Sequence, residues 1–133
     1  MSDVLCGEAG EVLKTLPEGS GNRCVTSPPY YGLRDYGESG QIGMEPTPQK
    51  YIERLVEVFD EVKRVLADDG TLWLNIGDTY AIKSCGMVKP KDLMGIPWTL
   101  AFALRERGWY LRSDIIWHKT NAIPEAVKDR PPK

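Results

Sequence analysis

One long segment of the chain carries apolar residues at helical spacing throughout. It begins after Thr47, a good N-cap, with Pro48 at the first helical position. Its apolar stripe consists of Tyr51, Leu55, Val58, Phe59, Val62, Val65 and Leu66. The turn-forming residues 68–70, Asp-Asp-Gly, end the pattern. This segment is the clearest helix that the sequence predicts.

Two shorter segments also have helical spacing. The first lies around residues 12–16 and is ended by Pro17. The second runs from about residue 93 to residue 107, where Gly108 can stop it, and Pro97 fits only near its start. Together with the long segment, they give three expected helices.

Short apolar or alternating runs predict four strands. They lie at residues 3–6, 24–26, 71–76 and 109–119. Strands and helices then alternate along the chain, which is typical of an α/β fold with a mostly parallel sheet and flanking helices. Right-handed crossovers would place helices on both faces of that sheet.

Two long irregular loops, at residues 31–46 and 77–89, follow the second and third of these strands. Loops of this length in a small domain are usually functional or disordered. Ligands of open α/β sheets bind beyond the carboxyl ends of the strands. Residues 27–30 and the loop after Ile76 both stand at such ends.

Length and composition limit the kinds of protein this chain can be. A chain of 133 residues, 41% of them hydrophobic, can form one modest core, so residues 1–133 are expected to be a single domain. No apolar run is as long as a membrane span, and the N-terminus has no basic region followed by an apolar stretch. These features predict a cytoplasmic protein, while the oligomeric state stays open.

The formal net charge of −2 conceals an asymmetry along the chain. Residues 1–76 carry 7 basic and 13 acidic side chains, whereas residues 77–133 carry 10 basic and 6 acidic ones. The second part could supply a surface that faces phosphate. Ordinary surface variation accounts for these totals equally well, because phosphate binding depends on local clusters of Lys and Arg.

The motif Thr26-Ser27-Pro28-Pro29-Tyr30 stands where the second strand ends. Two prolines cannot continue a central strand, so the sheet must stop there. In this position the motif resembles the catalytic motif of the DNA amino-methyltransferases, which act on N4 of cytosine or N6 of adenine. The likeness continues in the family's order through residues 32–37, 41–43, 64–66, 69–75, 95–98 and 114–119.

The resemblance is to the permuted class, which has this motif near the N-terminus. It implies a partial Rossmann-like methyltransferase fold that transfers a methyl group from S-adenosylmethionine to double-stranded DNA with a flipped target base. Because Ser27 stands where other members have Asp, the chain resembles the N4-cytosine subgroup more than the N6-adenine subgroup. N6 of adenine remains the alternative.

The chemistry of amino methylation explains why such a motif is useful. The lone pair of the target nitrogen is delocalised into the base, so two hydrogen-bond acceptors at the amino hydrogens are needed to localise it for in-line attack. Ser27 Oγ is the expected first acceptor and the Pro28 carbonyl the second. Pro28 and Pro29 fix the backbone that carries this carbonyl. Tyr30 offers a flat face on which the flipped base can stack.

Other residues have expected roles with ordinary alternatives. Trp117 stands where the family has an aromatic residue beside the target-base pocket, although it could equally be a core residue. Contacts with DNA are expected from Arg34, Lys83, Lys89 and Lys119, each of which could instead be a solvated loop charge. His118 is the single histidine, and no metal is expected.

The part of the family's cofactor site that is expected in this sequence is small. Glu8, after Gly7, stands where the family has an Asp that faces the adenine of the cofactor. The family's Asp-Pro-Phe-x-Gly-x-Gly motif does not occur in this sequence, and the glycines of residues 37–43 follow no predicted strand. We therefore expect this chain alone to bind S-adenosylmethionine weakly or not at all, and to need a missing C-terminal half as partner for activity.

Two further interpretations remain open. The chain could be a truncated, inactive remnant that still binds nucleic acid. It could also belong to methyltransferases that use the same kind of motif on RNA or on protein amides.

Overall fold

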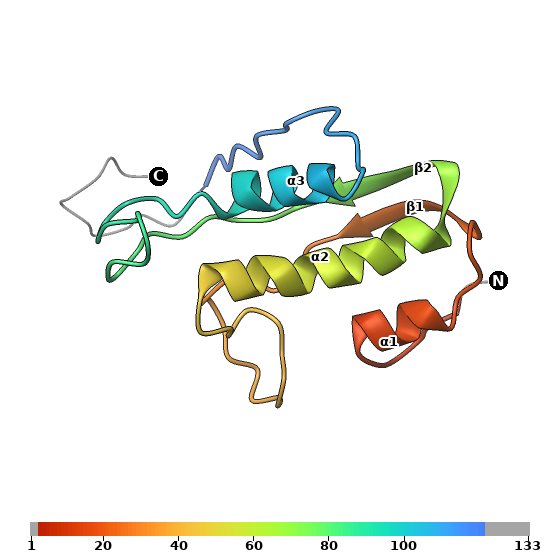
Figure 1. Cartoon of the computed structure of the whole chain (residues 1–133), viewed down its shortest axis with the longest axis horizontal. Coiled ribbons are helices and arrows are strands. Elements are labelled where there is room, and N and C mark those ends of the chain that lie inside the picture. Colours follow the sequence, from red (N-terminus) through yellow and green to blue (C-terminus); the bar gives the residue numbers. More distant parts are fainter. Residues whose placement is uncertain (1–2, 122–133) are drawn as a thin grey trace.

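The computed structural model describes residues 3–121, which form three helices and two strands (Figure 1). In chain order these are α1 (Ala9–Lys14), β1 (Gly21–Thr26), α2 (Pro48–Val65), β2 (Leu66–Leu74) and α3 (Ile96–Glu106). The alternation of helices with parallel strands confirms the α/β fold class. No helix between residues 3 and 121 is long and apolar enough to cross a membrane.

Helix α2 forms where the long apolar stripe predicts it. The Thr47 side chain caps the helix by accepting a hydrogen bond from the Lys50 N–H at 3.2 Å, and Pro48 occupies the first turn. The buried face of the helix consists of Tyr51, Ile52, Leu55, Phe59, Val62 and Val65. The helix ends at Val65, before the predicted turn, because Leu66 is already extended.

Strands β1 and β2 pair in parallel, with α2 as the crossover between them. Their register places Cys24 opposite Leu72 and Thr26 opposite Leu74, and the Asn75 N–H still donates to the Thr26 carbonyl at 2.9 Å. The predicted turn at residues 68–70 lies inside β2 and interrupts its register. Gly70 is required there, because a Cβ atom would lie 2.8 Å from the Ala67 carbonyl oxygen.

Helix α3 begins at Ile96, later than the pattern predicts, because a side chain from the preceding loop fixes its start. The carboxylate of Asp78 accepts hydrogen bonds from the backbone N–H groups of Gly95, at 2.9 Å, and Ile96, at 3.1 Å. Pro97 lies in the first turn as predicted. At the other end, Gly108 has φ +85°, a left-handed conformation that stops the helix as expected.

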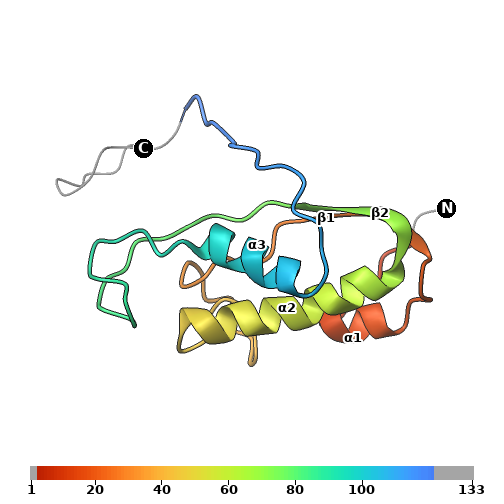
Figure 2. The ribbon, with the colours of Figure 1, turned by 45° about the horizontal axis from the view of Figure 1, so that its top comes forward.

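The hydrophobic core lies between the sheet and the helices. It is centred on α2 and α3, through residues such as Leu55, Phe59 and Leu100, with Cys24 and Leu72 of the sheet packed against it. The helices lie on one side of the two strands (Figure 2). One face of the sheet therefore covers the core.

Three details of the predicted architecture are wrong for the described residues. Residues 3–6 and 109–119 form no strand, because a strand needs a neighbour for its backbone hydrogen bonds and neither segment pairs with β1 or β2. Helices do not cover both sheet faces either, since one crossover between two strands places a helix on one side. On the other face, Val25 and its register partner Trp73 are 74% and 50% exposed.

Candidate active site

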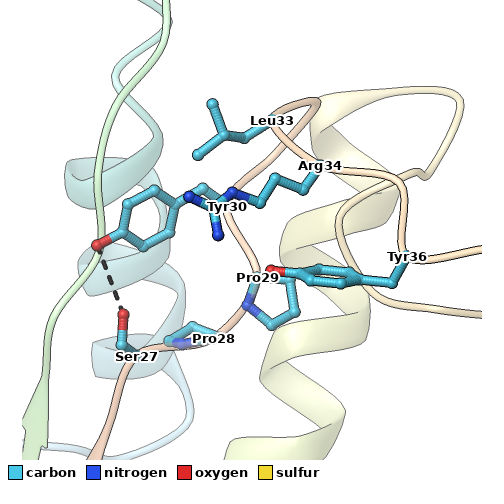
Figure 3. Close-up of a pocket in the computed structure, with 7 residues that line it drawn as sticks. All are labelled: Ser27, Pro28, Pro29, Tyr30, Leu33, Arg34 and Tyr36. Atoms are coloured by element: carbon cyan, nitrogen blue, oxygen red, sulfur yellow. Dashed lines mark hydrogen bonds between the residues drawn. The ribbon is translucent and has the colours of Figure 1, made fainter.

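The Ser-Pro-Pro-Tyr motif follows the carboxyl end of β1, where the parallel sheet stops. β1 ends at Thr26, as the two prolines predict. The motif lines a cavity of about 260 Å³ (Figure 3) together with three residues of the following loop. The lining residues are Ser27, Pro28, Pro29, Tyr30, Leu33, Arg34 and Tyr36.

The hydroxyl groups of Ser27 and Tyr30, two of the lining residues, point toward each other (Figure 3). Ser27 is exposed, and its Oγ lies 3.5 Å from the hydroxyl oxygen of Tyr30, at the outer limit of a hydrogen bond (Figure 3). No stronger partner of the Ser27 hydroxyl is found between residues 3 and 121, so its oxygen can accept a hydrogen bond from a ligand. The four predicted catalytic residues are thus brought together around one space.

A core residue holds the proline pair in place. The buried hydroxyl of Tyr51, on the first turn of α2, donates a hydrogen bond to the Pro29 carbonyl at 2.8 Å. Burial raises the pKa of Tyr51 well above its usual range, and the negative charge of Glu45 raises it further. The Tyr51 hydroxyl therefore stays protonated into alkaline conditions and donates a hydrogen bond to the Pro29 carbonyl.

Two glycines allow other segments to approach the motif closely. A Cβ atom on Gly77, just after β2, would lie 2.7 Å from Cε2 of Tyr30, so the ring rests against a bare backbone. Gly43, with φ +105°, lies against the Tyr30 carbonyl, where a Cβ atom would come within 3.0 Å. Its own carbonyl accepts a hydrogen bond from the Gly32 N–H at 2.8 Å. Both ends of the loop at residues 31–46 are thereby fixed to the motif.

The other predicted site residues lie outside this cavity. Lys83, Lys89 and Lys119 are exposed, and the first two lie in the loop that follows β2. Trp117 is 74% exposed and is not among the residues that line the cavity. Arg34, which the sequence offers as a contact with phosphate, is the exception, because it lines the cavity itself.

Glu8 lies in a separate place and has a structural task. It is the N-cap of α1, and its Oε2 accepts a hydrogen bond from the Glu11 N–H at 2.9 Å. It borders an open hollow of about 490 Å³ that shares no lining residue with the cavity at Tyr30. Among the described residues, the cavity at Tyr30 and the hollow at Glu8 are thus two separate places.

Sequence reasoning missed the residues that position the motif. Tyr51 stands in the apolar stripe of α2, where a Tyr among Leu, Val and Phe indicates a buried hydroxyl that needs a partner. Gly77 follows an apolar strand directly, and a glycine at a strand end indicates a close backbone approach. Neither pattern alone names the partner, which comes from a distant part of the chain.

The structure combines an α/β scaffold with a hydroxyl, a proline corner and an aromatic ring at a strand end, which is the arrangement that the resemblance to the amino-methyltransferases implies. Residues 22–133 match the family model N6_N4_Mtase, described as DNA methylase. The chain belongs to this DNA methylase family of N6 and N4 methyltransferases. The expected family is thereby confirmed.

Curated relatives and solved structures agree with this assignment. The chain is 55% identical to the Type II methyltransferase M.XycI of Xanthomonas campestris pv. cyanopsidis, covering 98% of this chain and 50% of that protein. It is 54% identical to the Type II methyltransferase M.Cfr9I of Citrobacter freundii, covering 94% of this chain and 49% of that protein. The chain therefore spans about half the length of these relatives.

The structure is similar to that of TTHA0409 from Thermus thermophilus, described as a DNA modification methylase. The TM-score is 0.65 at 28% identity, over 90% of this chain and 48% of that one. The same protein was also solved in complex with S-adenosyl-L-methionine, and that structure matches with a TM-score of 0.59 at 26% identity.

Proposed function

We propose that this chain forms the base-binding half of a DNA methyltransferase that methylates N4 of cytosine. The observation that carries the proposal is the common cavity of Ser27, Pro28 and Tyr30 at the carboxyl end of β1. A base extruded from double-stranded DNA would stack on Tyr30, recovering roughly 1–3 kcal/mol of lost stacking. Its amino group would lie at Ser27.

At this place the chain's own residues would prepare the amino group for reaction. Ser27 Oγ and the Pro28 carbonyl would accept its two hydrogens and draw the nitrogen toward tetrahedral geometry. The amine would then form a bond to the methyl carbon while the bond from that carbon to sulfur breaks, its electron pair staying on sulfur. The methylated amine would afterwards release one proton to water. No strong base is required, because the amine proton becomes acidic only once the methyl group is bound.

The methyl donor would be S-adenosylmethionine, which carries a transferable methyl group on a positively charged sulfur. Glu8 is the residue of this chain proposed to contact it, and the remaining contacts would come from the half of the relatives that this chain does not span. That half is proposed to complete the enzyme. Lys83, Lys89 and Lys119 would contact the DNA phosphates, and Trp117 would stand near the base once that half is in place.

The test uses a chimera in which this chain replaces the matched half of M.XycI. With labelled cofactor and duplex DNA, we expect methyl incorporation and, after hydrolysis of the DNA, N4-methylcytosine. Ser27→Ala should lower the rate roughly a hundredfold, since it removes one of two positioned acceptors. Ser20→Ala, which changes a hydroxyl bonded to the Pro17 carbonyl, is the matched control and should keep the rate.

The nature of the product and the response of the variants separate the alternatives. N6-methyladenine in the hydrolysate would assign the adenine reaction instead. Incorporation into RNA or protein but not DNA would move the chain to another substrate class. Full turnover by the Ser27→Ala or a Tyr30→Ala chimera would remove these residues from the mechanism.

A further inference from the structure

Arg34 presents unpaired hydrogen-bond donors to the cavity of the Ser-Pro-Pro-Tyr motif. Its side chain lines the cavity and extends from its loop toward Tyr30 (Figure 3). Among residues 3–121, the guanidinium has no hydrogen-bond or ion-pair partner. Arg34 is exposed, so its free donors are accessible to a ligand in this cavity.

The backbone around Arg34 is fixed, although its side chain is not. Gln41 reaches across the loop: its Nε2 donates to the Arg34 carbonyl at 3.0 Å, and its Oε1 accepts from the Tyr36 N–H at 2.7 Å. The neighbouring carboxylate, Asp35, accepts from the Gly37 N–H at 2.8 Å. The loop thus holds the Arg34 backbone at the cavity, and the carboxylate of Asp35 is bonded to the loop backbone.

The chemistry of the guanidinium determines which part of a base it can contact. Arginine has five N–H donors and no acceptor, so it cannot bind the amino group that Ser27 would receive. It can bind two adjacent acceptors in the same plane. Cytosine has such a pair, N3 and O2, next to its amino group. Adenine has one acceptor there, N1, followed by a C–H group.

We propose that Arg34 is a specificity-determining residue that selects cytosine by donating hydrogen bonds to N3 and O2 of the extruded base. The proposal rests on the base site proposed above and names the base that this site takes. Ser27 would then receive one end of the Watson–Crick edge and Arg34 the other, with Tyr30 stacked on the ring. Adenine would leave part of the guanidinium fork without a partner, which makes it the weaker ligand.

The test measures base binding directly and requires no methyl transfer. The ¹⁵N-labelled chain is titrated with two single-stranded DNA pentamers, TTCTT and TTATT, while the amide signals of Ser27 and Tyr30 are followed by nuclear magnetic resonance. We expect the cytosine pentamer to bind roughly tenfold to a hundredfold more tightly, which is the discrimination of one bidentate contact.

Three variants distinguish hydrogen bonding of Arg34 to the base from a contact that depends on its charge alone. Arg34→Met should abolish the preference by weakening the cytosine pentamer, with the adenine pentamer changed less than threefold. Arg34→Lys keeps the charge without the planar fork and should also lose the preference. Arg23→Met, at an exposed arginine of β1 outside the cavity, is the matched control and should retain it.

Each other outcome assigns the failure to one proposal. If neither pentamer shifts Ser27 or Tyr30, the proposed base site is wrong and the role of Arg34 falls with it. If both pentamers shift them with equal affinity, the base site stands and the selection of cytosine is overturned. If Arg34→Met weakens both pentamers equally, Arg34 is a contact with phosphate. If Arg34→Lys keeps the preference, the bidentate contact of Arg34 with the base is overturned.

Discussion

At the scale of single residues, the geometry of the motif depends on a buried hydroxyl that does not line the cavity. Tyr51 is fully buried, yet its hydroxyl reaches the Pro29 carbonyl at 2.8 Å and so fixes the corner on which Ser27 and Tyr30 stand. A proline pair supplies rigidity but no orientation of its own. The contact from α2 supplies the orientation, which makes Tyr51 a positioning residue for the motif.

The raised pKa of Tyr51 predicts how stability changes in alkali. A tyrosine ionises near pH 10 in the unfolded chain but later in the folded one, so its contribution is complete below about pH 10 and is lost as the pH rises further. The free energy of unfolding should fall there by up to about 1.4 kcal/mol per pH unit for this one group. Urea unfolding between pH 8 and pH 11 measures the slope.

Tyr51→Phe tests whether this group is responsible. The variant keeps the ring but removes the ionising hydroxyl, so its unfolding free energy should fall less steeply above pH 10. Part of the slope should persist, because burial also raises the pKa of Cys24 and Tyr31. Tyr110→Phe, at a residue that is 86% exposed, should leave the slope unchanged. Equal slopes for Tyr51→Phe and the unaltered chain would refute the assignment.

At the scale of elements, the site arises where the end of β2 meets the motif after β1. The parallel register brings Thr26 beside Leu74, so the segments that follow them also run together, and Gly77 then lies under the Tyr30 ring. A sequence pattern can predict that two strands end at the same edge of a sheet. The register itself decides which residue faces which.

Gly77→Ala should therefore displace the Tyr30 ring. The new methyl group would lie 2.7 Å from the ring, so the ring must move or the strand end must shift, at a cost of roughly 1–3 kcal/mol. In a sample labelled at tyrosine, the Tyr30 ring signals should change more than those of Tyr110. Gly21→Ala, where a Cβ atom meets its nearest neighbour at 3.5 Å, is the control. Unchanged Tyr30 signals in Gly77→Ala would contradict this packing.

The difference between prediction and structure has a physical cause at this same scale. The stripe of α2, the stop at Thr26 and the left-handed Gly108 depend on local spacing and local backbone preferences, and all three were predicted correctly. Residues 3–6 and 109–119 have the composition of strands, but a strand depends on a partner that local spacing cannot supply. The place of the motif at a strand end follows from its two prolines and its expected role from the family resemblance, whereas the contacts of Tyr51 and Gly77 are long-range.

At the scale of the whole molecule, the cavity at Tyr30 and the hollow at Glu8 are formed by different parts of the chain and share no lining residue. The cavity at Tyr30 is bordered by both an acceptor and a donor side chain, as a base requires. The hollow at Glu8 is open, and its two carboxylates already have partners, since Glu8 caps α1 and Glu11 pairs with Lys14. Base binding and cofactor binding should therefore be separable in this chain.

Calorimetry can separate them. Titration of this chain with S-adenosylmethionine should give an affinity weaker than micromolar, because the open hollow encloses little of the cofactor and one oxygen of Glu8 is already bonded to the Glu11 N–H. The chimera with the other half of M.XycI is the positive control and should bind. A micromolar affinity of this chain alone would show that the hollow beside α1 closes around the cofactor, and Glu8→Gln should then weaken it.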